Sequence, residues 1–340
     1  MNTACTSRSD PARHVVFATD DRGFEPLQVA VYSLLRSADP AFPLRVSVLT
    51  GCRPLNSDHR AEIARLAARF PFATVECIDV DEKMGRHLAV FADDALWGRM
   101  AWARCLIGEL FPESHGNIVY LDIDTFVCED LDALYRLDLT GKVLAAVPEE
   151  HREEGRPLDP VWQNGLLDPR AERYCNSGVL VMNVDAFRDE RLLSRIGEWY
   201  RLHRAEIIRP DQDTLNCLFW NRIAYLHPRY NHCDGWLERQ LKEDRRAEFW
   251  RGNTQREVLE AIVDPAILHF WGSKKPWRWN HRPEGARYAQ AMRDLGVLKG
   301  ALPGTTPGRR VLGGLFAAYH ALLRLLVLRR LRRLTSGFMV

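Results

Sequence analysis

The feature that most constrains the fold of this chain is a regular alternation of short apolar runs with helical patterns over residues 14–220. The apolar runs are rich in Val and Ile, which is typical of strands that helices cover on both faces. This order predicts an α/β fold with a mostly parallel sheet flanked by helices. With 46% hydrophobic residues, the 340-residue chain has an ample core and is not of the disordered class. We expect strands at 14–19, 45–50, 73–79, 117–121, 143–147 and 178–184, and helices at 26–38, 57–70, 97–111, 185–204 and 211–220.

Cysteine spacing and local composition indicate the cellular compartment and the domain boundaries. The chain has eight cysteines, and no two of them form a C-x-x-C pair. We therefore expect neither a zinc ribbon nor a disulfide scaffold. The polar N-terminus lacks the apolar core of a secretory signal, so we expect a cytoplasmic protein. We predict a disordered N-terminus at 1–13, a single large domain at 14–285, a linker at 286–308 and a tail at 309–340.

Carboxylates follow two of the expected strands at the point where each ends. Asp20 and Asp21 come after the first strand, and Asp122 and Asp124 form a D-x-D motif after 117–121. In open α/β sheets, ligands bind beyond the carboxyl ends of the strands. Two carboxylates so close repel each other unless a cation lies between them, and Mg²⁺ or Mn²⁺ suits carboxylate oxygens. The alternative is a polar strand end in a solvated loop, which the short motif does not exclude.

A histidine and a pair of lysines lie further along the chain. His269 stands in the apolar run 266–270, and Gly272, Lys274 and Lys275 follow it. Imidazole is a good ligand for Mn²⁺, glycine lets backbone approach a phosphate, and a lysine ammonium pairs with it. The alternative is a histidine packed at the edge of the core. Three tryptophans nearby either stack on sugar faces or pack in the core: Trp271, Trp277 and Trp279.

Six sequence blocks stand out along the chain: VVFATDD (15–21), ARCLIGELFP (103–112), NIVYLDIDTFV (117–127), YCNSGVLVMNVDAF (174–187), PDQDTLN (210–216) and LHFWGSKKPW (268–277). In this order and at this spacing, they resemble glycosyltransferase family 8, and within it the bacterial lipopolysaccharide galactosyl- and glucosyltransferases. The resemblance implies a GT-A, Rossmann-like domain that binds a nucleotide sugar. It also implies transfer of a hexose, galactose or glucose, from a UDP-sugar donor to a saccharide acceptor with retention of the anomeric configuration. The expected acceptor is lipopolysaccharide core or another membrane-linked glycan.

The same resemblance implies roles for individual residues. Asp122, Asp124 and His269 match the ligands of Mn²⁺, with Mg²⁺ as the alternative ion. The sequence departs from the family's pattern at Arg22-Gly23-Phe24, and Glu149 stands where the family often has aspartate. The implied donor-binding residues are Ala18 and Asp20 at the uracil and ribose, Arg104, Asp122, Glu149, Asn176, Asp211 and Gln212 around the sugar, and Gly272 and Lys275 at the diphosphate.

Retention of configuration needs either double displacement through an enzyme nucleophile or attack on the face from which the leaving group departs. Gln212 lies where a nucleophile would be sought, and an amide is a poor nucleophile. We therefore favour same-face attack, with Gln212 and Asp211 as the catalytic residues that shape the sugar pocket. For Asp211 and Asp213 the alternative is a helix cap before Leu215.

Two other functions remain open from the residues. One is a catalytically silent UDP-sugar-binding protein on the same fold, and the retained Asp122, Asp124, His269, Gln212 and Lys275 argue against it. The other is a different nucleotide enzyme, such as a nucleotidyltransferase. The absence of a Gly-rich phosphate loop after the first strand disfavours it.

The tail differs in charge from the rest of the chain. The net charge is +2, yet residues 301–340 hold seven arginines and no acid, whereas the preceding residues hold 40 basic and 45 acidic side chains. The apolar run 311–328 includes His320 and Arg324, so a helix lying on an anionic membrane fits better than a transmembrane one. We expect an enzyme peripheral to the inner membrane face, with no nucleic-acid partner. A helix that packs on a partner subunit is the alternative.

Overall fold

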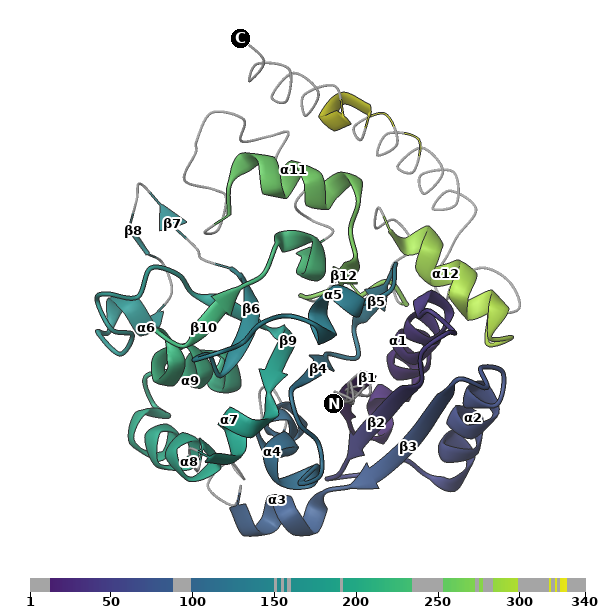
Figure 1. Ribbon diagram of the computed structural model, residues 1–340, viewed down its shortest axis with the longest axis horizontal. Helices are drawn as coiled ribbons and strands as arrows, with labels where there is room; N and C mark the ends of the chain where they lie inside the picture. The colour runs from purple at the N-terminus through teal and green to yellow at the C-terminus, as the bar shows by residue number, and fades with distance from the viewer. Residues whose placement is uncertain are drawn as a thin grey trace, which may run out of the picture.

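The computed structural model contains a seven-stranded sheet with helices on both faces (Figure 1). Its strand order is β10-β6-β9-β4-β1-β2-β3. The structure describes residues 13–87, 99–149, 152–153, 156–157, 160–189, 192–233, 253–272, 275–277, 284–298, 318, 322 and 325–328. The strands of the main sheet are β1 (Arg13–Thr19), β2 (Leu44–Thr50), β3 (Ala73–Asp79), β4 (Asn117–Leu121), β6 (Leu144–Pro148), β9 (Cys175–Asn183) and β10 (Ile223–Tyr225).

The main sheet is mostly parallel, as predicted, with β9 as the exception. Strand β1 pairs in parallel with β2 and β4, β2 with β3, and β10 with β6. Strand β9 runs antiparallel to both of its neighbours, β4 and β6. Its first residues therefore lie beside the last residues of β4, where Asp122 donates its backbone N–H to the carbonyl of Gly178 over 2.8 Å. This reversal brings the segment 175–178 to the carboxyl edge of the parallel strands.

Side chains of β1 alternate between two apolar layers because successive residues of a strand point to opposite faces. Val15 and Phe17 belong to one buried cluster, and Val16 and Ala18 belong to the other. The first layer includes α1 (Phe24–Ser37), α2 (Ser57–Ala67), α5 (Asp132–Tyr135), α11 (Gln255–Val263) and α12 (Gly285–Asp294). The second includes the 3₁₀ helix η3 (Arg99–Leu106), α4 (Ile107–Leu110), α7 (Val184–Asp189), α8 (Leu192–His203) and α9 (Pro210–Phe219).

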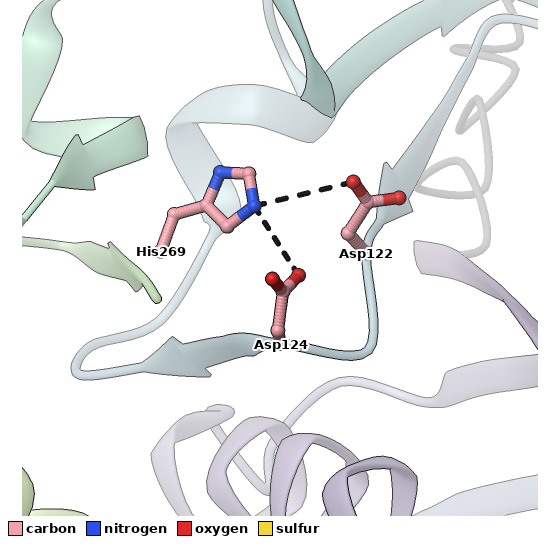
Figure 2. Close-up of side chains that lie close together, drawn as sticks. All are labelled: Asp122, Asp124 and His269. Atoms are coloured by element: carbon pink, nitrogen blue, oxygen red, sulfur yellow. Dashed lines mark ion pairs between the residues drawn. The ribbon is translucent and has the colours of Figure 1, made fainter. Parts of the chain in front are cut away.

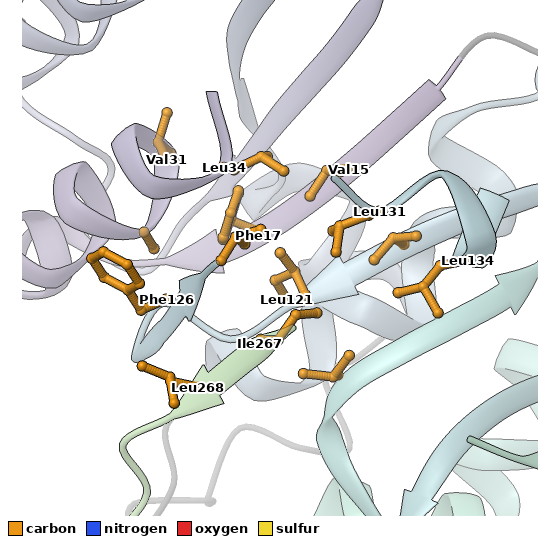
Figure 3. Close-up of a cluster of buried hydrophobic side chains, with 14 of the residues drawn as sticks. Val15, Phe17, Val31, Leu34, Leu121, Phe126, Leu131, Leu134, Ile267 and Leu268 are labelled. Atoms are coloured by element: carbon orange, nitrogen blue, oxygen red, sulfur yellow. The ribbon is translucent and has the colours of Figure 1, made fainter. Parts of the chain in front are cut away.

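A small second sheet brings distant segments together at the edge of the first layer. Strand β12 (Ile267–His269) pairs antiparallel with β5 (Thr125–Val127) and parallel with β11 (His232–Cys233). Ile267 and Leu268 pack with Phe126 and Leu121 in the first core cluster (Figure 3). The pairing places His269 opposite Thr125, one residue after the D-x-D motif. The remaining short elements are η1 (Asp21–Gly23), α3 (Asp81–His87), β7 (Arg152–Glu153), β8 (Arg156–Pro157), α6 (Pro160–Gln163) and η4 (Pro228–Asn231).

Several predicted boundaries differ from the structure. The helix expected at 97–111 is a 3₁₀ helix followed by one turn of α-helix, and the helix expected at 185–204 is two helices, α7 and α8. Strand β1 already begins at Arg13, and residues 1–12 lie outside the described residues. Helix α12 occupies the start of the predicted linker, because Tyr288 and Met292 bury an apolar face against the first layer.

Most of the predicted tail helix lies outside the described residues. Those that are described have helical backbone. Val327 is buried in the first core cluster, whereas Leu322, Leu325 and Leu326 are 46–56% exposed. Among the residues that the structure describes, no helix is long and apolar enough to cross a membrane.

Acidification from pH 7 to pH 5 should destabilise the protein by about 2 kcal/mol through His14 alone. Its buried ring donates from Nε2 to the Ser47 hydroxyl over 2.9 Å, and burial and the Arg45 charge lower its pKa from 6.5 to about 4. Between pH 6.5 and about pH 4, His14 binds a proton in the unfolded chain but not in the folded chain, so the free energy of unfolding falls as the pH falls. Urea unfolding at both pH values should show this loss in the parent but not in His14→Gln, and equal losses would contradict it.

Candidate active site

A cavity of about 790 Å³ opens at the carboxyl edge of the main sheet. It lies beyond the ends of β1 and β4, at the start of β9 and at the N-terminus of α9. The residues that the family resemblance assigns to donor binding, catalysis and metal ligation all line it, although they are spread over more than 250 positions of the chain. They are Ala18, Asp20, Arg104, Asp122, Asp124, Glu149, Asn176, Asp211, Gln212, His269, Gly272 and Lys275.

Three side chains converge in this cavity as a candidate metal site (Figure 2). Nε2 of His269 is 3.2 Å from Oδ1 of Asp124 and 4.0 Å from Oδ2 of Asp122. One ligand atom from each residue lies within 4.8 Å of the others. Asp122 follows β4, Asp124 precedes β5, and His269 ends β12, so the pairing of β5 with β12 assembles the group. Two carboxylates and one imidazole are a suitable donor set for Mn²⁺ or Mg²⁺.

Because Gly178 has no side chain, there is room beside it for the side chains of His269 and Asp122. A Cβ atom at this position would stand 2.2 Å from Cε1 of His269 and 2.9 Å from Oδ2 of Asp122. Any side chain here would therefore occupy the room that the imidazole and the carboxylate now use. The close approach of the β9 backbone, rather than a need for positive φ, explains glycine at this position.

Neighbouring charges oppose the effect of burial on the pKa of each candidate metal ligand. Burial would raise the pKa of Asp124, but the neighbouring His269 and Lys275 outweigh burial and hold it below its ordinary value. Burial opposes charge on His269, yet Asp124 and Asp122 raise the pKa of the imidazole. Burial also raises the pKa of Asp122, although Arg104 opposes the shift. The two carboxylates thus already attract positive charge, and a divalent cation is the kind of ligand that suits them.

Arg104 connects Asp122 of the candidate metal site to Asp211 of α9. Its buried guanidinium donates to Oδ1 of Asp122 over 3.0 Å and to the Ser177 carbonyl, and it lies 3.2 Å from Oδ2 of Asp211. It also covers the ring of Tyr120 at 4.3 Å. With its donors directed to protein oxygens, Arg104 holds two carboxylates of the cavity in place.

The two aspartates of α9 have different contacts. Oδ2 of Asp213 accepts the backbone N–H groups of Ile208 and Arg209, so this residue holds the segment that leads into the helix. Asp211 instead faces the cavity and accepts from the Ser177 hydroxyl over 2.9 Å. Oε1 of Gln212 accepts the backbone N–H of Ser177 over 3.1 Å. Within the described residues, Nε2 of Gln212 is buried without a hydrogen-bond partner.

The residues predicted to bind the nucleoside and the diphosphate also line the cavity. Asp20 accepts from Nε of Arg22 over 2.8 Å, and both residues line the cavity. Gly272 has a φ of 82°, a left-handed conformation that suits glycine. Lys275 donates to Asp124 and, over 2.9 Å, to the Phe270 carbonyl. The tryptophans at 271 and 277 line the cavity, and Trp279 lies outside the described residues.

Sequence reasoning missed Asn231, which touches a predicted metal ligand. Its Oδ1 is 2.8 Å from Nδ1 of His269, and its Nδ2 donates to Oδ1 of Asn176 over 2.8 Å. A single asparagine after an irregular segment carries no periodic or motif signal. Only the contact with His269 identifies it.

Comparisons with known proteins agree with this geometry. The family model of Glycosyl transferase family 8 matches residues 14–281. General stress protein A of Bacillus subtilis (strain 168) is 27% identical over 276 residues, or 80% of this chain and 90% of that protein. Lipopolysaccharide 1,2-glucosyltransferase of Escherichia coli (strain K12) is 25% identical over 200 residues, or 58% of this chain and 55% of that enzyme.

A solved structure of the galactosyltransferase LgtC, in complex with donor and acceptor sugar analogues, has the same fold. It aligns with a TM-score of 0.66 and 25% identity over 87% of this chain and 99% of that chain. The α/β fold and the family resemblance expected from the sequence are both confirmed. Since the family model covers most of the chain, including every residue of the cavity named above, the chain belongs to glycosyltransferase family 8.

Proposed function

We propose that this glycosyltransferase is a retaining enzyme that moves a hexose, galactose or glucose, from a UDP-sugar to a saccharide acceptor. The observation that carries the proposal is the group Asp122, Asp124 and His269 at the centre of a cavity lined by the donor-binding candidates. The relatives named for lipopolysaccharide glucosylation and for galactosyl transfer support a hexose donor and a glycan acceptor. We propose lipopolysaccharide core or another membrane-linked glycan as that acceptor.

The cavity has the groups that sugar transfer needs. Asp122, Asp124 and His269 would hold Mn²⁺ or Mg²⁺, which when bound supplies Lewis-acid stabilisation for the leaving diphosphate. The Lys275 ammonium, which donates to Asp124, would also donate to the diphosphate and so add positive charge beside it. Ala18 and Asp20 would contact the nucleoside, and Gly272 would let the backbone approach the phosphates.

The contacts of α9 support same-face attack over double displacement. Oδ2 of Asp211 accepts from the Ser177 hydroxyl and lies 3.2 Å from the Arg104 guanidinium, whose positive charge makes the carboxylate a weaker nucleophile. Gln212 carries an amide, a poor nucleophile, whose Oε1 accepts the Ser177 N–H. Its buried Nε2 is instead a donor for a sugar oxygen. We therefore propose that both residues orient the donor sugar while the acceptor hydroxyl attacks.

The proposed function is tested by UDP release from a panel of UDP-sugars that includes UDP-galactose and UDP-glucose. The parent protein is assayed with Mn²⁺, with Mg²⁺ and with a chelator. We expect release from at least one donor, supported by Mn²⁺ and abolished by the chelator. Failure to release UDP from any donor with either ion would contradict the proposal.

We also propose that the tail holds the enzyme at an anionic membrane surface, where lipid-linked acceptors lie. The support is the excess of seven arginines over residues 301–340 and the exposure of Leu322, Leu325 and Leu326. Apolar contact together with charge is what binds helices to such surfaces.

Replacing the exposed leucines Leu322, Leu325 and Leu326 with glutamine should weaken binding to anionic vesicles at least tenfold, since a tenfold change needs only about 1.4 kcal/mol. The variant keeps Val327, which packs in the core, so UDP release should persist. Co-sedimentation with vesicles of phosphatidylglycerol measures the binding. A variant that sediments like the parent would contradict the membrane proposal.

A further inference from the structure

Asn231 lies between the candidate metal site and the sugar end of the cavity. It ends the 3₁₀ helix η4, and its side chain is only 5% exposed. One end of its amide contacts Nδ1 of His269 and the other contacts Oδ1 of Asn176, both at 2.8 Å. Asn176 in turn donates to Oε2 of Glu149 and, over 3.2 Å, to Oε1 of Gln212. A continuous chain of hydrogen bonds therefore runs from His269 to Gln212.

Backbone groups determine which way each amide in this chain points. The N–H of Gly178 donates to Oδ1 of Asn176 over 2.8 Å, and the N–H of Ser177 donates to Oε1 of Gln212. A backbone N–H can only donate, so these two atoms must be oxygens. The atom of Asn231 that faces Oδ1 of Asn176 must then be the donor, Nδ2. Its other end, facing Nδ1 of His269, is consequently the oxygen Oδ1.

This orientation fixes the hydrogen on Nδ1 of the imidazole. Because Oδ1 of Asn231 can only accept, Nδ1 of His269 carries a hydrogen and donates it. Nε2, which lies 3.2 Å from Oδ1 of Asp124, is therefore the ring nitrogen that would give its lone pair to a cation, which takes the place of any proton held there by Asp124. The opposite tautomer would direct an N–H at the metal position and leave Nδ1 facing an oxygen.

The backbone holds Asn231 and His269 in fixed relation. Strand β11, which begins at the next residue, pairs in parallel with β12, and Leu268 is the partner of His232. The N–H of Ala266 donates to the carbonyl of Arg229 over 2.9 Å, which ties the two segments together upstream. Asn231 is therefore held by the same strand pair that carries the histidine.

We infer that Asn231 is a positioning residue that orients His269 for metal binding and couples this site to the donor-sugar pocket through Asn176. The inference rests on the proposed function, because it presumes that His269 ligates a divalent cation. Hydrogen-bond partners that orient a ligating histidine commonly contribute 10- to 100-fold to metal affinity. Asn231 thus acts through His269 and Asn176, without touching the metal itself.

The test measures Mn²⁺ affinity of the full chain by electron paramagnetic resonance, without donor. Asn231→Leu, which keeps the branched shape but has no polar atom, should bind Mn²⁺ about 10- to 100-fold more weakly. Asn231→Asp keeps an acceptor for Nδ1 of His269 and should stay within about threefold of the parent. Since aspartate cannot donate to Asn176, this variant should still lose affinity for UDP-sugar relative to UDP. Visible absorption of the Co²⁺-loaded proteins reports whether the imidazole still coordinates.

Asn183→Leu is the matched control, because Asn183 is a partly buried amide at the far end of β9 that donates to the carbonyls of Leu139 and Lys142. It should bind Mn²⁺ like the parent. Parent-like Mn²⁺ affinity in Asn231→Leu, or an equal loss in Asn231→Leu and Asn231→Asp, would overturn the inference. Failure of the parent itself to bind Mn²⁺ would instead contradict the metal in the proposed function, so the two failures are distinguishable.

Discussion

Asp124→Ala should lower UDP release at least about 10³-fold with every donor that the parent accepts, because it removes a ligand of the cation that stabilises the leaving diphosphate. Asp124 is also the contact of both His269 and Lys275. Its loss leaves the Lys275 ammonium and the His269 imidazole without the carboxylate that both contact. Steady-state UDP release and Mn²⁺ affinity measure the effect, and Mn²⁺ affinity should fall in parallel.

The matched control for Asp124→Ala is Asp138→Ala. Asp138 accepts the backbone N–H of Thr140 in an exposed turn, remote from the cavity lining. This variant should release UDP at the rate of the parent. Asp124→Ala activity within tenfold of the control would show that the metal group is not what drives transfer.

Gly178→Ala should weaken Mn²⁺ binding and UDP release by more than about 100-fold, although alanine adds a single methyl group. The added Cβ would stand 2.2 Å from Cε1 of His269, far inside contact distance. The ring has little freedom to retreat, since it is 4% exposed and Asn231 holds its Nδ1. Asp122 cannot move away readily either, because its N–H is bonded to the Gly178 carbonyl.

The matched control for Gly178→Ala is Gly85→Ala, which adds the same methyl group at another position. Gly85 lies in α3, and a Cβ there would have no atom within 4 Å. Alanine is favoured over glycine in a helix, so this variant should be at least as stable as the parent. Thermal unfolding of both variants shows whether Gly178→Ala is still folded when it loses Mn²⁺ binding. A Gly178→Ala protein that binds Mn²⁺ like the parent would refute the steric argument.

Local patterns were sufficient for most of the fold. The apolar runs correctly predicted the six long strands, since burial on both faces demands continuous apolar sequence in every one of them except the edge strand β3. They did not predict that β9 runs antiparallel, because strand direction depends on the pairing partner. Helix α12 was also missed, because its amphipathic face is short and lies at the start of the stretch, 286–308, that was predicted to be a linker.

The candidate site shows the same division between local and non-local information. Asp122 and Asp124 were predicted from their place after an apolar strand, and His269 from its place in another. Their convergence depends on the antiparallel pairing of β5 with β12, two strands separated by about 140 residues. Asn231 and Gly178 acquire their importance only from what lies beside them, so no pattern in the sequence marks them as the metal site's neighbours.

The sequence by itself determined the fold class, the family blocks and the chemical types gathered in the cavity, because apolar period and side-chain chemistry are properties of local segments. Only the tertiary structure decided which of Asp211 and Asp213 faces the cavity and which holds the residues that lead into α9. It alone also brought Asn231 against Nδ1 of His269. The physical reason is that hydrogen-bond direction and steric room arise between segments that meet only on folding.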